Sequence, residues 1–117
     1  MLSRAIAILV SLTVLTVGAN ATSTSADVTG EYASNWDDVK LVREGSHVHG
    51  TYVCCGGGTI EGKIYQGRII RYHWKQPGGE GEGIWEIVAP DRIEGTWGSG
   101  QSDNDGGRWD LERKLPN

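Results

Sequence analysis

Short runs of alternating apolar and polar residues fill the chain from Gly30 onward, and Gly, Pro, Asn or Asp separates one run from the next. A period of two is typical of half-buried antiparallel strands, because successive side chains of a strand point to opposite faces. The runs predict eight strands, at about residues 30–36, 38–43, 46–53, 59–64, 68–76, 82–88, 92–97 and 108–113. Tight hairpin turns are expected at Glu44-Gly45, Gln66-Gly67 and Ala89-Pro90-Asp91. Such short connections favour a meander, in which strands that follow one another in sequence also pair in space.

Glycines occur at a recurrent position within the predicted strands. The pattern apolar-x-Gly-x-apolar is found at 48–52, 60–64 and 93–97, and its second half at 83–85. With a period of two, Gly50, Gly62, Gly83 and Gly95 share the inward face with the large apolar residues. An inward glycine lets a strand bend sharply and lets a neighbouring ring lie over it, and both effects help to close a barrel. We therefore expect an all-β fold, an eight-stranded antiparallel meander closed into an up-and-down barrel, after an N-terminal signal helix.

The composition supports this fold class and limits the size of the protein. The 117 residues include 18 Gly, 5 Trp, 4 Tyr and no Phe, and each interior glycine costs a helix about 1 kcal/mol relative to alanine. This glycine content argues against a helical bundle, and the chain is long enough for one small domain only. Charged residues at outward positions, such as Glu61, Lys63 and Arg71, exclude the apolar outer surface of an outer-membrane barrel.

The first residues have the three parts of a secretory signal peptide: Arg4, an apolar run from Ala5 to Val17, and a small-residue triplet that ends at Ala21. We expect a signal peptide at 1–21, a flexible leader at 22–29 and the barrel domain at 30–117, without a transmembrane segment after cleavage. Loss of Arg4 lowers the 11 basic side chains to 10, against 15 acidic ones, and this balance argues against nucleic acid as a partner. The predicted location is secreted or periplasmic.

Six large rings form the aromatic part of the predicted inward face. They are Tyr52, Tyr72, Trp74, Trp85, Trp97 and Trp109. One interpretation is an aromatic-lined cup at a barrel mouth for a small cyclic or aromatic ligand, such as a sugar ring or a planar heterocycle. The other is that the rings fill a barrel whose remaining inward positions are glycine. The pattern leaves both interpretations open.

Cys54 and Cys55 are adjacent and are followed by three glycines in a predicted loop. The glycines would permit the distorted backbone that a bond between neighbouring cysteines requires. Two free thiols, or a bond between chains, fit the sequence equally well. A stiffened loop tip is favoured over redox chemistry, because the nearby sequence contains no basic cluster that would lower the pKa of a thiol.

His47 and His49 share one face of a predicted strand, a spacing that is common among metal ligands. The interpretation we favour is that surface histidines pair with Glu61 and Glu86 on neighbouring strands. The chain has no nucleophile elbow, no HExxH motif and no phosphate-binding glycine loop before a helix. We therefore expect no catalytic residue and no cofactor.

Parts of the chain resemble the avidin family and, more broadly, calycin-like small barrels. Gly30-Glu31-Tyr32-Ala33-Ser34-Asn35-Trp36 and Val48-His49-Gly50-Thr51-Tyr52 are similar to the opening strands of avidins, and Tyr72-His73-Trp74-Lys75 to a later strand. The resemblance implies an eight-stranded meander and places Tyr52 where avidins have the tyrosine that contacts the ureido oxygen of biotin. Ser34, Asp38 and Cys54 stand where the family has an Asn and two Ser, so most of the ureido-binding set is missing. Residues 81–85 and 94–97 also resemble the glycine-rich hairpins of MORN repeats.

The sequence thus predicts an exported small barrel that acts by binding, without catalysis, as a monomer or an oligomer. Its partner would be a small molecule at an aromatic mouth or another exported protein. The alternative from a different class is an exported metal, redox or enzymatic protein that uses His47, His49, Cys54 and Cys55.

Overall fold

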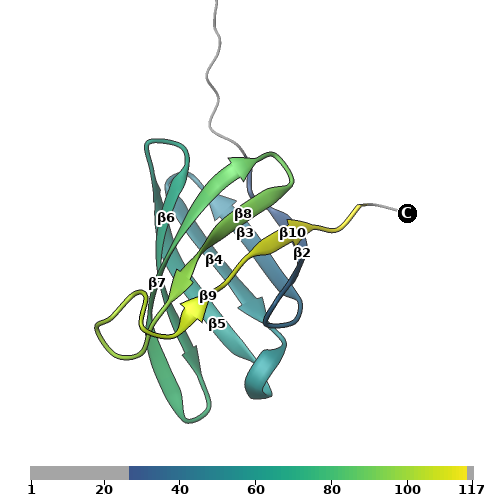
Figure 1. The fold of residues 1–117 in the computed structure, drawn as a ribbon. Coiled ribbons are helices and arrows are strands. Elements are labelled where there is room, and N and C mark those ends of the chain that lie inside the picture. The colour runs from purple at the N-terminus through teal and green to yellow at the C-terminus, as the bar shows by residue number, and fades with distance from the viewer. Residues whose placement is uncertain (1–26, 116–117) are drawn as a thin grey trace, which may run out of the picture.

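A computed structural model describes residues 27–115 as one antiparallel sheet (Figure 1). Its strands are β2 (Gly30–Ser34), β3 (Val39–Glu44), β4 (His47–Tyr52), β5 (Gly58–Tyr65), β6 (Ile69–Gln76), β7 (Gly79–Ala89), β8 (Arg92–Trp97), β9 (Gly107–Arg108) and β10 (Leu111–Arg113). A 3-10 helix, η2 (Cys54–Gly56), lies between β4 and β5. The predicted signal peptide falls outside the described residues. Within residues 27–115, no helix is long and apolar enough to span a membrane.

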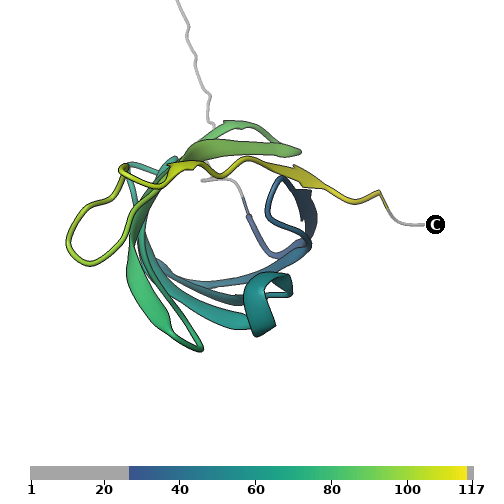
Figure 2. The same cartoon turned by 60° about the horizontal axis from the view of Figure 1, so that its bottom comes forward.

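The sheet closes on itself. The strands pair in the order β10-β2-β3-β4-β5-β6-β7-β8-β9, and β10 also pairs with β8. Seen toward one end, the strands form a ring (Figure 2). β9 and β10 together make the last strand: β9 pairs with Thr96 and Trp97, and Leu111 of β10 lies between Ile93 of β8 and Ser34 of β2. The closed, eight-stranded up-and-down barrel predicted from the sequence is confirmed, and closure removes the exposed edges of an open sheet.

Most strand bounds lie within one residue of the predicted ones, and three strands differ by more. β2 ends at Ser34 and not at residue 36, because the chain turns away at Asp37, which has a φ of 74°. β7 begins at Gly79, because the ladder with β6 continues to the pair formed by Gly79 and Gln76. The predicted strand at 108–113 is interrupted at Trp109 and Asp110. There, the Trp109 N–H donates to the Gly95 carbonyl at 2.9 Å, and the Gly95 N–H donates to Asp110 Oδ1 at 3.1 Å. A side-chain carboxylate therefore replaces a main-chain acceptor, and the regular ladder stops at this point.

Inward glycines lie across from the large rings, as the sequence pattern predicts. Tyr72 pairs with Gly62 on one side and with Gly83 on the other, and Trp85 pairs with Gly95. A Cβ at Gly83 would overlap the Tyr72 ring, and a Cβ at Gly95 would lie 2.8 Å from Cδ1 of Trp85. The glycines thus leave the space that the neighbouring rings occupy.

The middle of the barrel is filled by aromatic rings. Tyr72 stacks on Trp85 with ring centroids 4.0 Å apart, and Trp109 meets Trp85 edge-on at 5.2 Å. The Tyr72 hydroxyl donates to the Thr96 carbonyl at 3.0 Å, and Trp85 Nε1 donates to the Trp109 carbonyl at 3.0 Å. The buried polar atoms of both rings are therefore satisfied. Smaller side chains and one further ring complete this core: Val28, Tyr32, Val39, Leu41, Val48, Ile60, Ile64, Ile70, Ile93 and Leu111.

Candidate functional site

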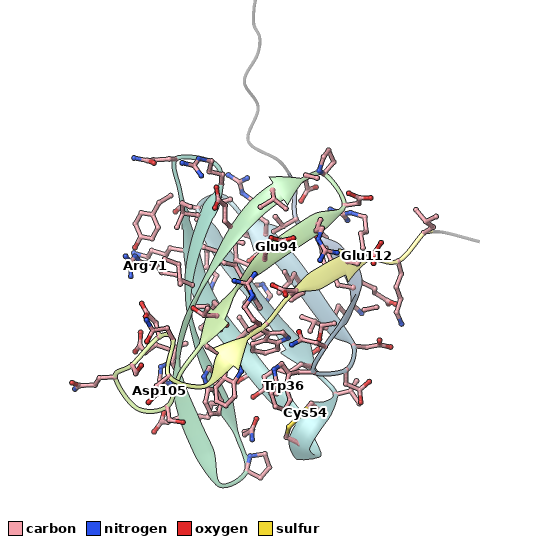
Figure 3. All side chains as sticks on the ribbon, in the orientation of Figure 1. Trp36, Cys54, Arg71, Glu94, Asp105 and Glu112 are labelled. Atoms are coloured by element: carbon pink, nitrogen blue, oxygen red, sulfur yellow. A yellow bond between two sulfur atoms is a disulfide. The ribbon has the colours of Figure 1, made fainter. Side chains whose placement is uncertain are left out.

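A pocket of about 270 Å³ opens at the end of the barrel where β4, β6 and β8 finish. Figure 3 shows Trp36 and Cys54 at this end of the molecule. The pocket is lined by Trp36, Tyr52, Cys54, Cys55, Trp74, Gln76, Gly78, Gly79, Trp97, Ser99 and Trp109. Its size is just below the range of about 300–1,000 Å³ that is typical of small-molecule sites. It could therefore enclose a molecule of roughly one ring.

Aromatic rings that meet nearly at right angles form a large part of the pocket wall. Trp97 meets Trp36 at a centroid distance of 5.5 Å and an interplanar angle of 88°, and it meets Trp74 at 5.7 Å and 81°. Tyr52 meets Trp109 at 5.2 Å and 88°. Edge-to-face contacts of this kind are the favoured geometry for aromatic pairs. The rings therefore hold one another in position, so the aromatic wall is formed before a ligand binds.

Hydrogen bonds hold two of these rings in place from within the barrel. Trp74 Nε1 donates to the Gly98 carbonyl at 2.9 Å, and Trp109 Nε1 donates to Ser34 Oγ at 3.1 Å. Trp74 is placed by β6, whereas Trp109 lies at the interruption between β9 and β10. Because both indole N–H groups are used internally, these rings would contribute contact surface to a ligand, not hydrogen bonds.

Trp36 reaches the mouth because the chain leaves β2 after Ser34. The backbone turns at Asp37, which has a φ of 74°. Trp36 Nε1 donates to the Arg108 carbonyl at 3.0 Å, and Asn35 Nδ2 donates to the same carbonyl at 2.9 Å. The ring itself remains 39% exposed. This segment thus holds a large aromatic surface at the entrance of the pocket.

Two side chains of the pocket keep a polar group that is free to donate a hydrogen bond. Gln76 Oε1 accepts a hydrogen bond from the Tyr52 hydroxyl at 2.7 Å. Neither Gln76 Nε2 nor Ser99 Oγ has a hydrogen-bond partner among the described residues, although the Ser99 main-chain N–H donates to Asp105 at 2.9 Å. The amide and the hydroxyl are therefore available to a bound molecule.

Trp97 differs from the other indoles of the pocket. Its Nε1 is buried and has no hydrogen-bond acceptor within residues 27–115. A Cβ at Gly106 would overlap the Trp97 ring, so the loop after β8 covers one face of the indole. A buried N–H without a partner costs about 1–3 kcal/mol. Trp97 is thus held by its ring contacts and not by its polar atom.

The pocket carries no charge near neutral pH. Its described lining contains no acidic or basic side chain. Burial raises the pKa of Tyr52 to about 12, so the phenol stays protonated under physiological conditions. The site therefore offers neither a counter-ion for a charged ligand nor a group that could act as an acid or base near pH 7.

Cys54 and Cys55 form a disulfide with each other, which selects one of the three alternatives that the sequence left open. The backbone at the bond is left-handed, with a φ of 68° at Cys55, and it continues with φ of 91° at Gly56 and 87° at Gly57. Both cysteines line the pocket. The sequence predicts neither the place of the disulfide in the pocket lining nor its proximity to the aromatic rings.

The structure divides the six predicted ring residues into two layers. Tyr52, Trp74, Trp97 and Trp109 line the pocket, whereas Tyr72 and Trp85 lie deeper, in the filled middle of the barrel. Two of the six rings therefore fill the interior, and the other four border a cavity.

Five lining residues were missing from the predicted site. They are Trp36, Gln76, Gly78, Gly79 and Ser99. Two of them could have been predicted from strand alternation. In the predicted strands, Trp36 lies on the same face as buried Tyr32, and Gln76 lies on the same face as buried Trp74. Ser99 lies beyond the end of β8, where parity gives no information.

The histidines lie on the outer wall of the barrel. His47 Nε2 is 2.8 Å from Glu61, as the predicted cross-strand pairing requires, and His49 Nε2 is 3.5 Å from Glu44. The predicted partner Glu86 instead contacts an arginine. Among the described residues, no group of three or more His, Cys, Asp or Glu side chains could hold a metal ion.

Comparisons of the chain with protein-family models, curated proteins and solved structures found no match. The closed eight-stranded barrel agrees with the fold that the avidin and calycin resemblance implies. The comparisons give no support for membership of those families. Any inference about function therefore depends on the geometry of the pocket.

Proposed function

We propose that this protein is a non-catalytic binding module for a small, uncharged cyclic molecule that enters the aromatic mouth of the barrel. The observation that carries the proposal is the pocket of about 270 Å³, with rings at right angles and no ionic side chain in its described lining. Concave sites with aromatic walls and a few polar groups are typical of small-molecule binding.

The polar groups of the lining favour a ligand that accepts hydrogen bonds. Gln76 and Ser99 supply donors without partners among the described residues. A charged ligand would lose its hydration in a pocket without a counter-charge, and this costs free energy. A sugar ring or planar heterocycle with carbonyl, ether or hydroxyl oxygens would use both the rings and the donors.

The proposed setting is outside the cytoplasm. The signal-peptide pattern at 1–21 predicts export. The Cys54–Cys55 disulfide supports it, because disulfides persist in oxidising compartments and are rare in the cytosol.

The test is to titrate the protein with glucose, N-acetylglucosamine, uracil and indole while recording the indole N–H signals of its tryptophans by NMR. We expect at least one probe to shift the signals of Trp36, Trp74 and Trp97, which line the pocket, and to leave that of fully buried Trp85 in place. Native mass spectrometry of protein purified from its source would identify a molecule that copurifies.

A matched pair of variants locates the binding. Trp36→Ala should weaken binding about tenfold, because it removes a large aromatic contact surface at the entrance of the pocket. Tyr65→Ala is the control, because this ring is similarly exposed, at 47%, but lies at the opposite end of β5 from the pocket. If no probe binds and no small molecule copurifies, the proposal is wrong. Equal losses in the two variants would place the binding elsewhere.

A further inference from the structure

The pocket lining includes a disulfide. The Cys54–Cys55 disulfide lines the cavity together with the aromatic rings and lies at its end of the barrel (Figure 3). Cys54 is half-buried and packs against the hydrophobic core, whereas Cys55 is exposed. Sulfur is polarisable and makes favourable contacts with aromatic rings. The bond therefore offers a cyclic ligand a further contact surface beside the indoles.

We propose that the Cys54–Cys55 disulfide is a ligand-contacting wall of the pocket, so that the oxidised protein binds its ligand more tightly than the reduced protein. The proposal rests on the function proposed above. It assigns to the cysteine pair a binding role that neither the adjacent spacing nor the glycines of the loop predict.

We expect the conformation of the loop to depend on this bond. Cys55 has a φ of 68°, and Gly56 and Gly57 follow with φ of 91° and 87°. Glycine adopts such angles without penalty, but an L-residue with a side chain does so at a cost. Cys55 is held in the left-handed region while it is bonded to Cys54. Once the bond is opened, Cys55 can return to an ordinary backbone conformation, and the loop moves with it.

The loop also touches the neighbouring parts of the pocket. A Cβ at Gly58 would overlap the Tyr52 ring, and a Cβ at Gly56 would lie 3.6 Å from Cγ of Pro77. The Tyr52 hydroxyl in turn donates to Gln76 at 2.7 Å. Movement of the loop would therefore displace the Tyr52 ring and the Gln76 amide that accepts its hydrogen bond. It would also move the two sulfur atoms away from the cavity.

Reduction of the bond is a balanced exchange with a dithiol. A thiolate of the dithiol attacks one sulfur of the pair, most accessibly that of exposed Cys55, which forms a mixed disulfide and releases the Cys54 sulfur as a thiolate that takes up a proton. The second thiolate of the reductant then displaces Cys55, giving a cyclic disulfide and a second cysteine thiol. The barrel should stay folded, because a bond between neighbouring residues closes almost no loop in the unfolded chain.

The experiment compares four proteins: the oxidised wild type, the wild type reduced with dithiothreitol, Cys54→Ala/Cys55→Ala, and Cys54→Ala/Cys55→Gly. Each is titrated with indole and with N-acetylglucosamine, and the tryptophan indole N–H signals are recorded. We expect both variants to bind about tenfold more weakly than the oxidised protein because they lack the sulfur atoms, and the reduced protein to bind about tenfold more weakly because its loop carries the two thiols away from the cavity. The Cys54→Ala/Cys55→Gly variant separates the effect of sulfur contact from the effect of loop conformation. Glycine at position 55 adopts the left-handed backbone angle without supplying sulfur. An unchanged signal of Trp85, which is fully buried, would show that the fold is intact.

The possible outcomes distinguish this inference from the proposed function. If a probe binds the oxidised and reduced proteins equally, the disulfide is not a binding wall, while the pocket function stands. If Cys54→Ala/Cys55→Gly binds as tightly as the oxidised protein, the role of the bond is to shape the loop, and the contact proposed here is wrong. If neither probe binds the oxidised protein and none of the other compounds does, both proposals fail.

Discussion

Replacing Gly83 with alanine would test whether an inward glycine sets the position of the Tyr72 ring. Gly83 is buried in β7, and its φ lies outside the left-handed region, so its backbone conformation tolerates alanine. A Cβ at this position would overlap Cζ and the hydroxyl of Tyr72. The ring has little freedom to tilt away, because it stacks on Trp85 at 4.0 Å and donates to the Thr96 carbonyl at 3.0 Å.

The free energy of unfolding should fall by about 2–3 kcal/mol, within the range observed for overpacked cores. Displacing the Tyr72 hydroxyl leaves the partly buried Thr96 carbonyl without this donor, at a cost of about 1–3 kcal/mol. Disturbing the stack with Trp85 costs about 0.5–1.5 kcal/mol. The lower chain entropy of alanine returns about 0.5–1 kcal/mol, which is too little to offset the two losses.

Urea unfolding followed by tryptophan fluorescence measures this change. Gly79→Ala is the matched control, because Gly79 lies in the same strand and a Cβ there would meet the Trp74 ring at an ordinary 3.7 Å. Its effect should stay within about 0.5 kcal/mol. In a Tyr72→Leu background, Gly83→Ala should cost at least about 1 kcal/mol less than in the wild type, since the shorter side chain leaves room for the methyl group.

Two results would refute this reasoning. One is a Gly83→Ala cost no larger than that of Gly79→Ala. The other is the same Gly83→Ala cost with tyrosine and with leucine at position 72, because additivity would mean that the methyl group and the ring do not interact.

Three further predictions concern single side chains. Trp97→Phe should cost about 1 kcal/mol less in urea unfolding than Trp74→Phe, because only Trp74 loses an indole hydrogen bond, and equal costs would contradict this. Hydrogen bonding to Glu80 raises the pKa of His73, so its stabilising effect should be present below about pH 6.5 and disappear as the pH rises through the raised pKa. The wild type should therefore exceed His73→Gln in stability by less than about 1 kcal/mol near pH 5.5 and not near pH 9, where a pH-independent difference would argue against the assignment. Burial raises the pKa of Tyr52 to about 12, so the unfolding free energy should fall as the pH rises from about 10 through 12. In Tyr52→Phe this fall should be smaller, and an identical alkaline profile would exclude Tyr52 as its source.

The strands were predictable because alternation and turn residues are local signals. The pattern around Tyr72 illustrates this: its inward parity and the glycines at 62 and 83 follow from the sequence, and the structure pairs Tyr72 with both. The interruption at Trp109 and Asp110 was not predictable, because it arises where the Asp110 carboxylate accepts the N–H of Gly95, 15 residues away in the chain.

The candidate site was predictable only in part. Parity identified Tyr52, Trp74, Trp97 and Trp109 as inward-facing, and all four line the pocket. Trp36 has the same parity as Tyr32 but was not included in the predicted set, and its place at the mouth depends on a distant contact, the main-chain carbonyl of Arg108 that accepts its indole N–H beyond the end of β2.

The sequence by itself determined the fold class, the approximate bounds of the strands and the set of rings that face inward, because a strand's two faces follow from its period of two. Only the tertiary structure decided how deep each ring lies, because parity specifies a face and not a height along the barrel. That height depends on how neighbouring strands are staggered when the barrel closes. The stagger buries Trp85 completely in the filled core and leaves Trp74 and Trp97 at a cavity. It also places Cys54 and Cys55, which are neighbours in sequence, in the lining of the same pocket as rings from four other parts of the chain.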